Sequence, residues 1–96
     1  MSLFESDFEW DEEKRLSILA ARNVDLREAA LIFEGAVITQ LDKRRDYGEV
    51  RWVSLGLVDG KAFFVVHTDR DGVTRLITAW QGGRNGKRRY QASFAD

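Results

Sequence analysis

Five polar side chains in the second half of this 96-residue sequence have the types needed to bind and cleave a phosphodiester. They are Glu49, Arg51, Thr68, Arg70 and Arg75. Arginine suits phosphate because its planar guanidinium stays charged and can donate to two phosphate oxygens at once. Cleavage of RNA without a metal ion needs a base for the 2′-hydroxyl, cations that stabilise charge at phosphorus, and an acid for the leaving oxygen. Glu49 could be the base and the three arginines the cations.

The same residues have a second interpretation that involves no ligand. Oppositely charged residues on neighbouring strands often form ion pairs across a sheet. Such pairs contribute little to stability at the surface, but they keep a sheet end soluble. Residue type and spacing alone therefore leave both a phosphate site and a structural ladder of ion pairs open.

The single histidine of the chain, His67, is another candidate for acid–base catalysis. Its unperturbed pKa lies near neutrality, so it can exchange a proton at physiological pH. Its place in an apolar run favours the alternative, a buried histidine that packs and forms a hydrogen bond. One histidine without any cysteine does not provide the ligands of a zinc site. We expect neither a metal ion nor a cofactor.

Two Asp-Gly pairs predict the strands that would bring the charged residues together. Asp59-Gly60 and Asp71-Gly72 each stand between two apolar runs. Asp-Gly is typical of two-residue hairpin turns, because both turn residues need a positive φ. The predicted antiparallel strands are residues 49–58, 61–70 and 73–80.

Tight turns also predict which residues face one another. Glu49 should lie opposite Arg70, and Arg51 opposite Thr68, which in turn lies opposite Arg75. The five residues would then share one face at one end of the sheet. That face should continue into the core with Val53, Leu55, Phe64, Val66, Ile77 and Ala79. The other face should carry Trp52, His67, Leu76, Thr74, Thr78 and Trp80, and a slip of one residue would exchange the two faces.

The N-terminal third has the pattern of two capped helices. Asp11 and Asp25 are the predicted N-caps, and acidic residues follow Asp11 in the first turn, where the helix dipole favours them. The first helix should run to about Arg22, and Gly35 should end the second. The stretch Phe8–Asp11 predicts a short edge strand that leads into the first cap.

A further strand near residues 36–41 and a C-terminal helix complete the expected architecture. We predict an α+β fold in which two N-terminal helices pack on an antiparallel meander of about four strands, with a C-terminal helix. Residues 1–96 should form a single domain, since this length and a hydrophobic content of 44% suit one modest core. The sequence has no apolar run that could span a bilayer and no signal-peptide pattern, so we expect a cytoplasmic protein.

Charge is distributed unevenly along the chain. Residues 1–34 hold nine acids and four bases, a net charge of −5, whereas residues 35–96 hold seven acids and eleven bases, a net of +4. The second part ends in a basic run, Arg84, Lys87, Arg88 and Arg89. This run suggests contact with nucleic acid, although a solvated helix face is the alternative.

The ordered set of motifs resembles the BrnT family over residues 8–90. The matching pieces are Phe8-Glu9-Trp10-Asp11 with Lys14, Val24 with Glu28-Ala29 and Phe33, Glu49-x-Arg51, Val65-Val66-His67-Thr68-x-Arg70, Arg75-Leu76-Ile77-Thr78-Ala79, and Tyr90. BrnT proteins are small toxins of type II toxin–antitoxin pairs with a fold similar to RelE. The resemblance implies a ribonuclease that stops translation. It also implies a BrnA-like ribbon-helix-helix antitoxin, through which the complex would bind operator DNA.

Two departures from the family pattern affect the expected site. Trp80 stands where the family has an arginine near the RNA, and Gly86 stands where it has an acid. Trp80 could stack on a base, as aromatic residues do in RNA sites, or fill an antitoxin interface. Lys14 is kept, so we add it to the residues expected to contact RNA. Three hypotheses remain, namely an endoribonuclease toxin, a toxin-like binding module without catalysis that serves as antitoxin partner and co-repressor, and a plain RNA-binding domain.

Overall fold

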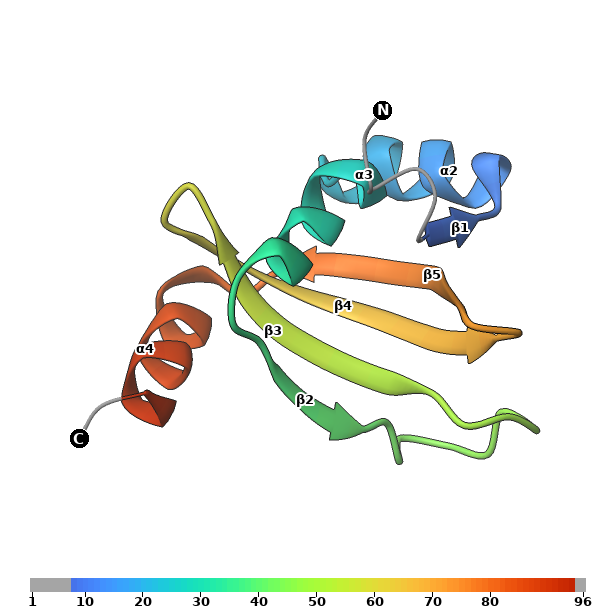
Figure 1. Ribbon diagram of the computed structural model, residues 1–96. Helices are drawn as coiled ribbons and strands as arrows, with labels where there is room; N and C mark the ends of the chain where they lie inside the picture. The colour runs from blue at the N-terminus through green and yellow to red at the C-terminus, as the bar shows by residue number, and fades with distance from the viewer. Residues whose placement is uncertain (1–7, 95–96) are drawn as a thin grey trace.

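A computed structural model of the chain describes residues 8–94 (Figure 1). The sheet is built from β1 (Phe8–Trp10), β2 (Ile38–Leu41), β3 (Trp52–Val58), β4 (Lys61–Arg70) and β5 (Val73–Gln81). The helices are α2 (Glu12–Arg22), α3 (Leu26–Ala29), a 3₁₀ helix η1 (Ala30–Glu34) and α4 (Gly83–Ser93). The predicted α+β class and the order of helices and strands are confirmed. None of the helices in this described range has the length and apolar character that crossing a membrane would require.

The sheet has five strands in the order β1-β5-β4-β3-β2. Strands β2 to β5 form the predicted antiparallel meander. The short strand β1 is added at the β5 edge and runs parallel to it, with Glu9 paired to Arg75. The edge strand predicted at Phe8–Asp11 is thus confirmed, and its parallel pairing with β5 makes the sheet mixed.

The helix boundaries follow the predicted capping residues. The Asp11 side chain accepts a hydrogen bond from the Lys14 backbone N–H at 3.1 Å, which satisfies a donor of the first turn of α2. At the other end Asn23 adopts the left-handed conformation, with φ 55° and ψ 36°. Asp25 caps α3, where its side chain accepts from the Arg27 backbone N–H at 2.9 Å. The predicted second helix divides into α3 and the tighter η1, which ends at Gly35.

Both Asp-Gly turns form as predicted. Asp59 and Asp71 have φ of 50° and 51°, and each is followed by a glycine that also has positive φ. Val58 pairs with Lys61 and Arg70 with Val73. The strand expected from Glu49 begins only at Trp52, so Glu49 and Arg51 belong to the loop between β2 and β3.

A β-bulge in β5 changes which residues share a face. His67 pairs with Leu76, but the preceding residue Val66 pairs with Thr78, so Ile77 is the extra residue. One extra residue reverses the alternation of side chains beyond it. Thr78 and Trp80 therefore share a face with Val66, and Ala79 lies on the other face. The predicted positions of Thr78, Trp80 and Ala79 were wrong for this reason.

The main core lies between the N-terminal helices and one face of the sheet. Its buried side chains are Ile18, Val24, Leu26, Ala29, Ala30, Ile32, Phe63, Val65, Leu76 and Ala79. Among the strand residues predicted to be core, Ala79 belongs to this cluster. Leu55 and Val66 are buried as predicted, but on the other face of the sheet, which the N-terminal helices do not cover. Gly56 allows the closest approach, because a Cβ at this position would lie 2.6 Å from the Ile32 Cβ.

Helix α4 packs against the other face of the sheet, near the β3–β4 turn (Figure 1). A Cβ at Gly86 would lie 3.4 Å from the Phe64 ring and 3.5 Å from the Ala62 Cβ. The helix forms despite its glycines because this close contact holds it on β4. It covers only part of the face, and the remaining part carries two pockets.

Candidate functional site

The predicted charged residues meet in a pocket of about 220 Å³. Its lining consists of Asp11, Lys14, Glu49, Arg51, Arg70, Arg75, Leu76 and Ile77. We call it the charged pocket. Residues from α2, the β2–β3 loop, β4 and β5 build it, so distant segments of the chain converge there. Glu49, Arg51, Arg70 and Arg75 are thus neighbours, as the two hairpin turns predicted.

Glu49 is the centre of the hydrogen bonds in this pocket. Its carboxylate accepts from Arg51 Nε at 3.0 Å and from Arg70 Nη2 at 3.5 Å. These contacts lower the pKa of Glu49 below its ordinary value, with the Arg51 hydrogen bond as the largest cause. The carboxylate therefore stays ionised at neutral pH, and it can accept a proton rather than donate one.

Arg70 and Arg75 keep part of their donor capacity for a ligand. The Arg70 side chain is 53% exposed, and its contact with Glu49, at 3.5 Å, is longer than the 3.0 Å contact of Arg51 with Glu49. Arg75 Nη1 lies 3.6 Å from Glu9 Oε1, and the two residues are paired between β5 and β1. An arginine has five N–H donors, and these contacts use only some of them. The charged pocket carries more positive than negative charge, so an anion such as phosphate fits it.

The loop that carries Glu49 and Arg51 is attached to the sheet at several points. The Asp42 N–H donates to the Arg51 carbonyl at 2.8 Å, which closes the loop just beyond β2 and β3. Tyr47 lies under the Arg51 guanidinium, 4.2 Å from its ring centroid. Sequence reasoning missed Tyr47. An aromatic residue that stands between charged residues of the loop is the signal that could have indicated its contact with an arginine.

Thr68 does not line the charged pocket, although it faces Arg75 as predicted. Its hydroxyl donates to the Val50 carbonyl at 2.6 Å. Lys14 does line the pocket, from the first turn of α2. Asp11, which sequence reasoning used only as a helix cap, lies beside it.

His67 lies on the opposite face of the sheet, away from the charged pocket. It is buried, its Nε2 is hydrogen-bonded to Ser54 Oγ at 2.7 Å, and Ser54 in turn contacts Thr39 at 2.7 Å. The Phe33 ring packs edge-on against it at 5.1 Å between centroids. Burial lowers the pKa of His67, so the ring is neutral at physiological pH. This environment is that of a packing histidine.

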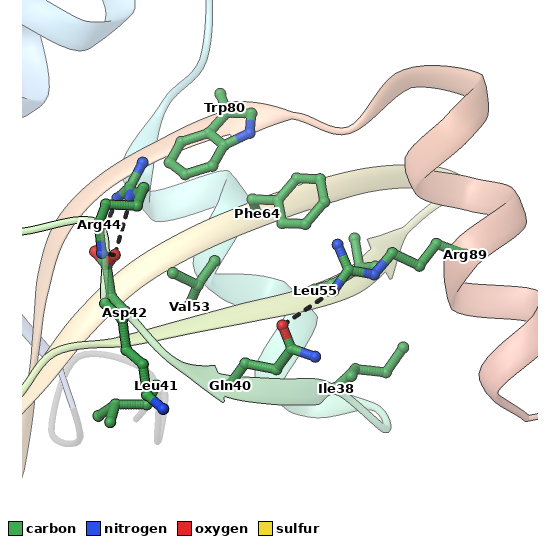
Figure 2. Close-up of a pocket in the computed structure, with 11 residues that line it drawn as sticks. Ile38, Gln40, Leu41, Asp42, Arg44, Val53, Leu55, Phe64, Trp80 and Arg89 are labelled. Carbon is green, nitrogen blue, oxygen red and sulfur yellow. Dashed lines mark hydrogen bonds and ion pairs between the residues drawn. The ribbon is translucent and has the colours of Figure 1, made fainter.

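A second pocket of about 340 Å³ lies beside α4 (Figure 2). It is on the same face of the sheet as the charged pocket, because Trp80 and Arg75 lie on one side of β5. We call it the aromatic pocket. Its lining consists of Ile38, Gln40, Leu41, Asp42, Lys43, Arg44, Val53, Leu55, Phe64, Trp80 and Arg89. Trp80 stacks on Phe64 with 5.5 Å between ring centroids, and the Arg44 guanidinium lies 5.2 Å from the Trp80 ring. Two of the residues expected to contact RNA, Trp80 and Arg89, thus meet here.

The rest of the basic run lines neither pocket. Arg84 and Arg88 are exposed on α4, and Lys87 is half-buried near the β3–β4 turn. Gly86 faces the sheet under α4. Within residues 8–94, no group of three or more histidine, aspartate or glutamate side chains is placed to hold a metal ion.

Comparison with known proteins confirms the resemblance seen in the sequence. No curated protein matches the chain. A family model matches residues 10–85, and it describes the ribonuclease toxin, BrnT, of type II toxin–antitoxin systems. The architecture of helices, sheet and C-terminal helix agrees with the RelE-like fold of that family. Because the match covers most of the sequence, the chain belongs to the BrnT family of ribonuclease toxins.

Proposed function

We propose that this protein is an endoribonuclease that cleaves RNA in the charged pocket and thereby inhibits translation. The observation that carries the proposal is the convergence of Arg51, Arg70 and Arg75 in one pocket with Glu49, whose carboxylate contacts both Arg51 and Arg70. A ladder of ion pairs would match each cation with its own acid. Here two arginines share one glutamate, and the surplus of donors is what a phosphodiester requires.

The arrangement supports a reaction that needs no metal ion. Glu49 takes the proton of the 2′-hydroxyl, and the 2′-oxygen attacks phosphorus. The bond from phosphorus to the 5′-oxygen breaks, which leaves a 2′,3′-cyclic phosphate and a 5′-hydroxyl. Arg70 and Arg75 stabilise the added negative charge on the phosphoryl oxygens. The leaving oxygen receives its proton from the Lys14 ammonium, which lines the same pocket.

The expected partners follow from this activity and from the family. A cytoplasmic toxin that cuts RNA needs an inhibitor, and we propose a BrnA-like antitoxin with a ribbon-helix-helix fold. Operator DNA would be bound only by the toxin–antitoxin complex, through the antitoxin. Residues 1–96 would act as one domain in that complex.

A second candidate function is a toxin-like binding module that has lost catalysis and acts as antitoxin partner and co-repressor. Two specific replacements favour it. Trp80 occupies the place of a family arginine and is stacked on Phe64, and Gly86 occupies the place of a family acid. The retained set Glu49, Arg51, Arg70 and Arg75 opposes it.

Induced expression in bacteria separates the two candidates. We would compare the wild type with an Arg70→Ala, Arg75→Ala double variant and follow growth and total RNA. The control is Lys61→Ala, which removes an exposed charge at the opposite end of the same sheet. We expect growth arrest and RNA loss for the wild type and the control, with cleavage reduced about 100-fold or more in the double variant.

Other outcomes of this experiment have definite meanings. Normal growth with soluble, folded wild-type protein would reject the ribonuclease and support the binding module. Equal arrest by the wild type and the double variant would place the activity outside the charged pocket. Restored growth on co-expression of a neighbouring ribbon-helix-helix protein would support neutralisation by an antitoxin.

A further inference from the structure

We propose that the aromatic pocket binds a nucleobase of the single-stranded RNA whose scissile phosphate lies in the charged pocket. This inference rests on the proposed function, because it assigns a subsite to the same substrate. It adds a site that reads the base, whereas the charged pocket contacts the sugar-phosphate backbone.

The two pockets lie on the same face of the sheet, within reach of one strand of RNA. Trp80 shares a face with Val66, and two residues along β4 Thr68 pairs with Arg75. Trp80 and Arg75 are therefore on one side of β5. They are five positions apart in sequence, with the bulge between them, which corresponds to roughly 15 Å along the strand. A short single strand can span this distance while one phosphate stays at Arg75.

The floor of the aromatic pocket suits a flat ring. Phe64 and Trp80 are nearly parallel, with 19° between their planes, and the aliphatic side chains of Val53 and Leu55 lie beside them (Figure 2). Trp80 and Phe64 are each only partly buried, and the Arg44 guanidinium lies over the Trp80 ring, so a base would stack on the part of the rings that these contacts leave open. Stacking on aromatic side chains is the main way in which proteins hold unpaired bases. The volume of about 340 Å³ admits a base with part of its ribose.

The charges around the pocket suit a polyanion. Lys43, Arg44 and Arg89 lie on its rim, and all three are exposed. The one acid there, Asp42, is fully buried at its side chain and accepts from Arg44 Nε and Nη2, both at 2.8 Å. Its charge is therefore balanced inside the protein. The Arg44 side chain remains 56% exposed and presents positive charge to the outside.

Polar groups on the rim could read the edge of the base. Arg89 Nη2 donates to Gln40 Oε1 at 3.0 Å, as the dashed line in Figure 2 shows. This hydrogen bond takes up one of the two lone pairs of Gln40 Oε1, and the N–H groups that remain on both side chains are donors. Paired donors recognise a base edge that offers adjacent acceptors. The pocket therefore combines a stacking surface with a selective rim.

An abasic-site walk tests this assignment without requiring cleavage. The probe is a short fluorescein-labelled 2′-O-methyl RNA, in which one position after another is replaced by an abasic residue. Its affinity for the wild type, Trp80→Ala and Trp80→Phe is measured by fluorescence anisotropy. The control is Leu16→Ala, which removes an exposed apolar side chain from α2. Circular dichroism verifies that each variant is folded.

We expect Trp80→Ala to bind the intact RNA about tenfold or more weakly, and Trp80→Phe to stay near the wild type because the ring is retained. One abasic position should weaken binding to the wild type and have no further effect on Trp80→Ala. The proposal is overturned if no position distinguishes these two proteins. It is also overturned if Trp80→Ala binds RNA normally but loses a BrnA-like antitoxin, since the pocket would then be a protein interface. Because the probe is uncleavable, absence of ribonuclease activity would reject the proposed function without deciding this test.

Discussion

Thr68 Oγ1 donates a hydrogen bond of 2.6 Å to the carbonyl oxygen of Val50, and this contact ties the β2–β3 loop to β4. Val50 lies between Glu49 and Arg51, so the bond positions the proposed base and one of the cations together. Thr68 itself is buried, with 4% of its surface exposed, and does not line the charged pocket. Its hydroxyl is therefore a positioning group that acts through the backbone.

We expect Thr68→Val to lower RNA cleavage while Thr68→Ser retains it. Valine has the shape of threonine but leaves the Val50 carbonyl without its donor, which should destabilise the protein by about 1–3 kcal/mol. The measurement is the cleavage rate below the melting temperature of each variant, together with Tm. Normal cleavage by Thr68→Val would show that the loop holds its position without this bond.

The ionisation of Glu49 should depend on its arginine neighbours. Hydrogen bonds from Arg51, and then Arg70, lower the pKa of Glu49 below its ordinary 4.5. The carboxylate therefore contributes to stability above pH 4.5, and this contribution is lost as the pH falls through the lowered value. In Arg51→Gln we expect the pKa of Glu49 to rise. Carbon-13 NMR of the carboxyl group measures this pKa directly, and an unchanged titration would contradict the contact between Arg51 and Glu49.

Stability should also change near neutral pH because of His67. Burial lowers the pKa of His67 below its ordinary 6.5, while the charge of Asp69 acts in the opposite direction. Unfolded chains bind the proton more readily, so the contribution to stability is present above pH 6.5 and declines as the pH falls from there toward the folded pKa. We expect Tm to fall over this window in the wild type. The decline in Tm should be smaller in His67→Gln, because glutamine does not titrate. Equal slopes of Tm against pH in the two proteins would assign the decline to another group.

Gly56 is predicted to be intolerant of any side chain. A Cβ there would lie 2.6 Å from the Ile32 Cβ, so η1 and β3 would have to separate. We expect Gly56→Ala to destabilise the protein by about 1–3 kcal/mol. Gly35→Ala is the matched control, because its Cβ would meet only the Ile32 carbonyl oxygen at 4.0 Å. Chemical denaturation of both variants measures the difference, and equal stability would refute the close approach.

The Gln40–Arg89 pair predicts a preference among bases if the aromatic pocket holds one. Their free N–H donors match guanine, whose N7 and O6 acceptors are adjacent. We expect tighter binding of guanine-containing than adenine-containing 2′-O-methyl RNA. Gln40→Glu should reduce this preference, because a carboxylate would engage Arg89 and repel the acceptors of guanine. Anisotropy titrations with the two RNAs provide the comparison.

The sequence was sufficient to predict the charged pocket but not the aromatic one, and the bulge at Ile77 explains the difference. Thr68, Arg70 and Arg75 lie between the Asp71-Gly72 turn and the bulge, so counting outward from the turn places them correctly. Trp80 lies beyond the bulge, and the same count places it on the wrong face. The stretch around Thr78 and Ala79 is held by distant contacts.

Those distant contacts are hydrogen bonds from Arg22 Nη1 to the Thr78 hydroxyl at 2.9 Å and to the Ala79 carbonyl at 3.1 Å. A residue 56 positions away in sequence thus fixes the local conformation of β5. Strand propensity and the alternation of polar and apolar residues describe only local preferences, so neither could indicate the bulge. The helix caps and the Asp-Gly turns were predictable because each depends on a few adjacent residues.

The parallel pairing of β1 with β5 has a consequence for synthesis on the ribosome. The chain makes Phe8–Trp10 first, but their partners Thr74–Leu76 emerge only after β2, β3 and β4. The same delay applies to the charged pocket, which combines Lys14 with Arg75. Such non-local pairings form late, after the intervening segments are available. A growing chain therefore carries an incomplete pocket, and the ribosome that makes this protein is exposed to the assembled pocket only after β5 has been translated.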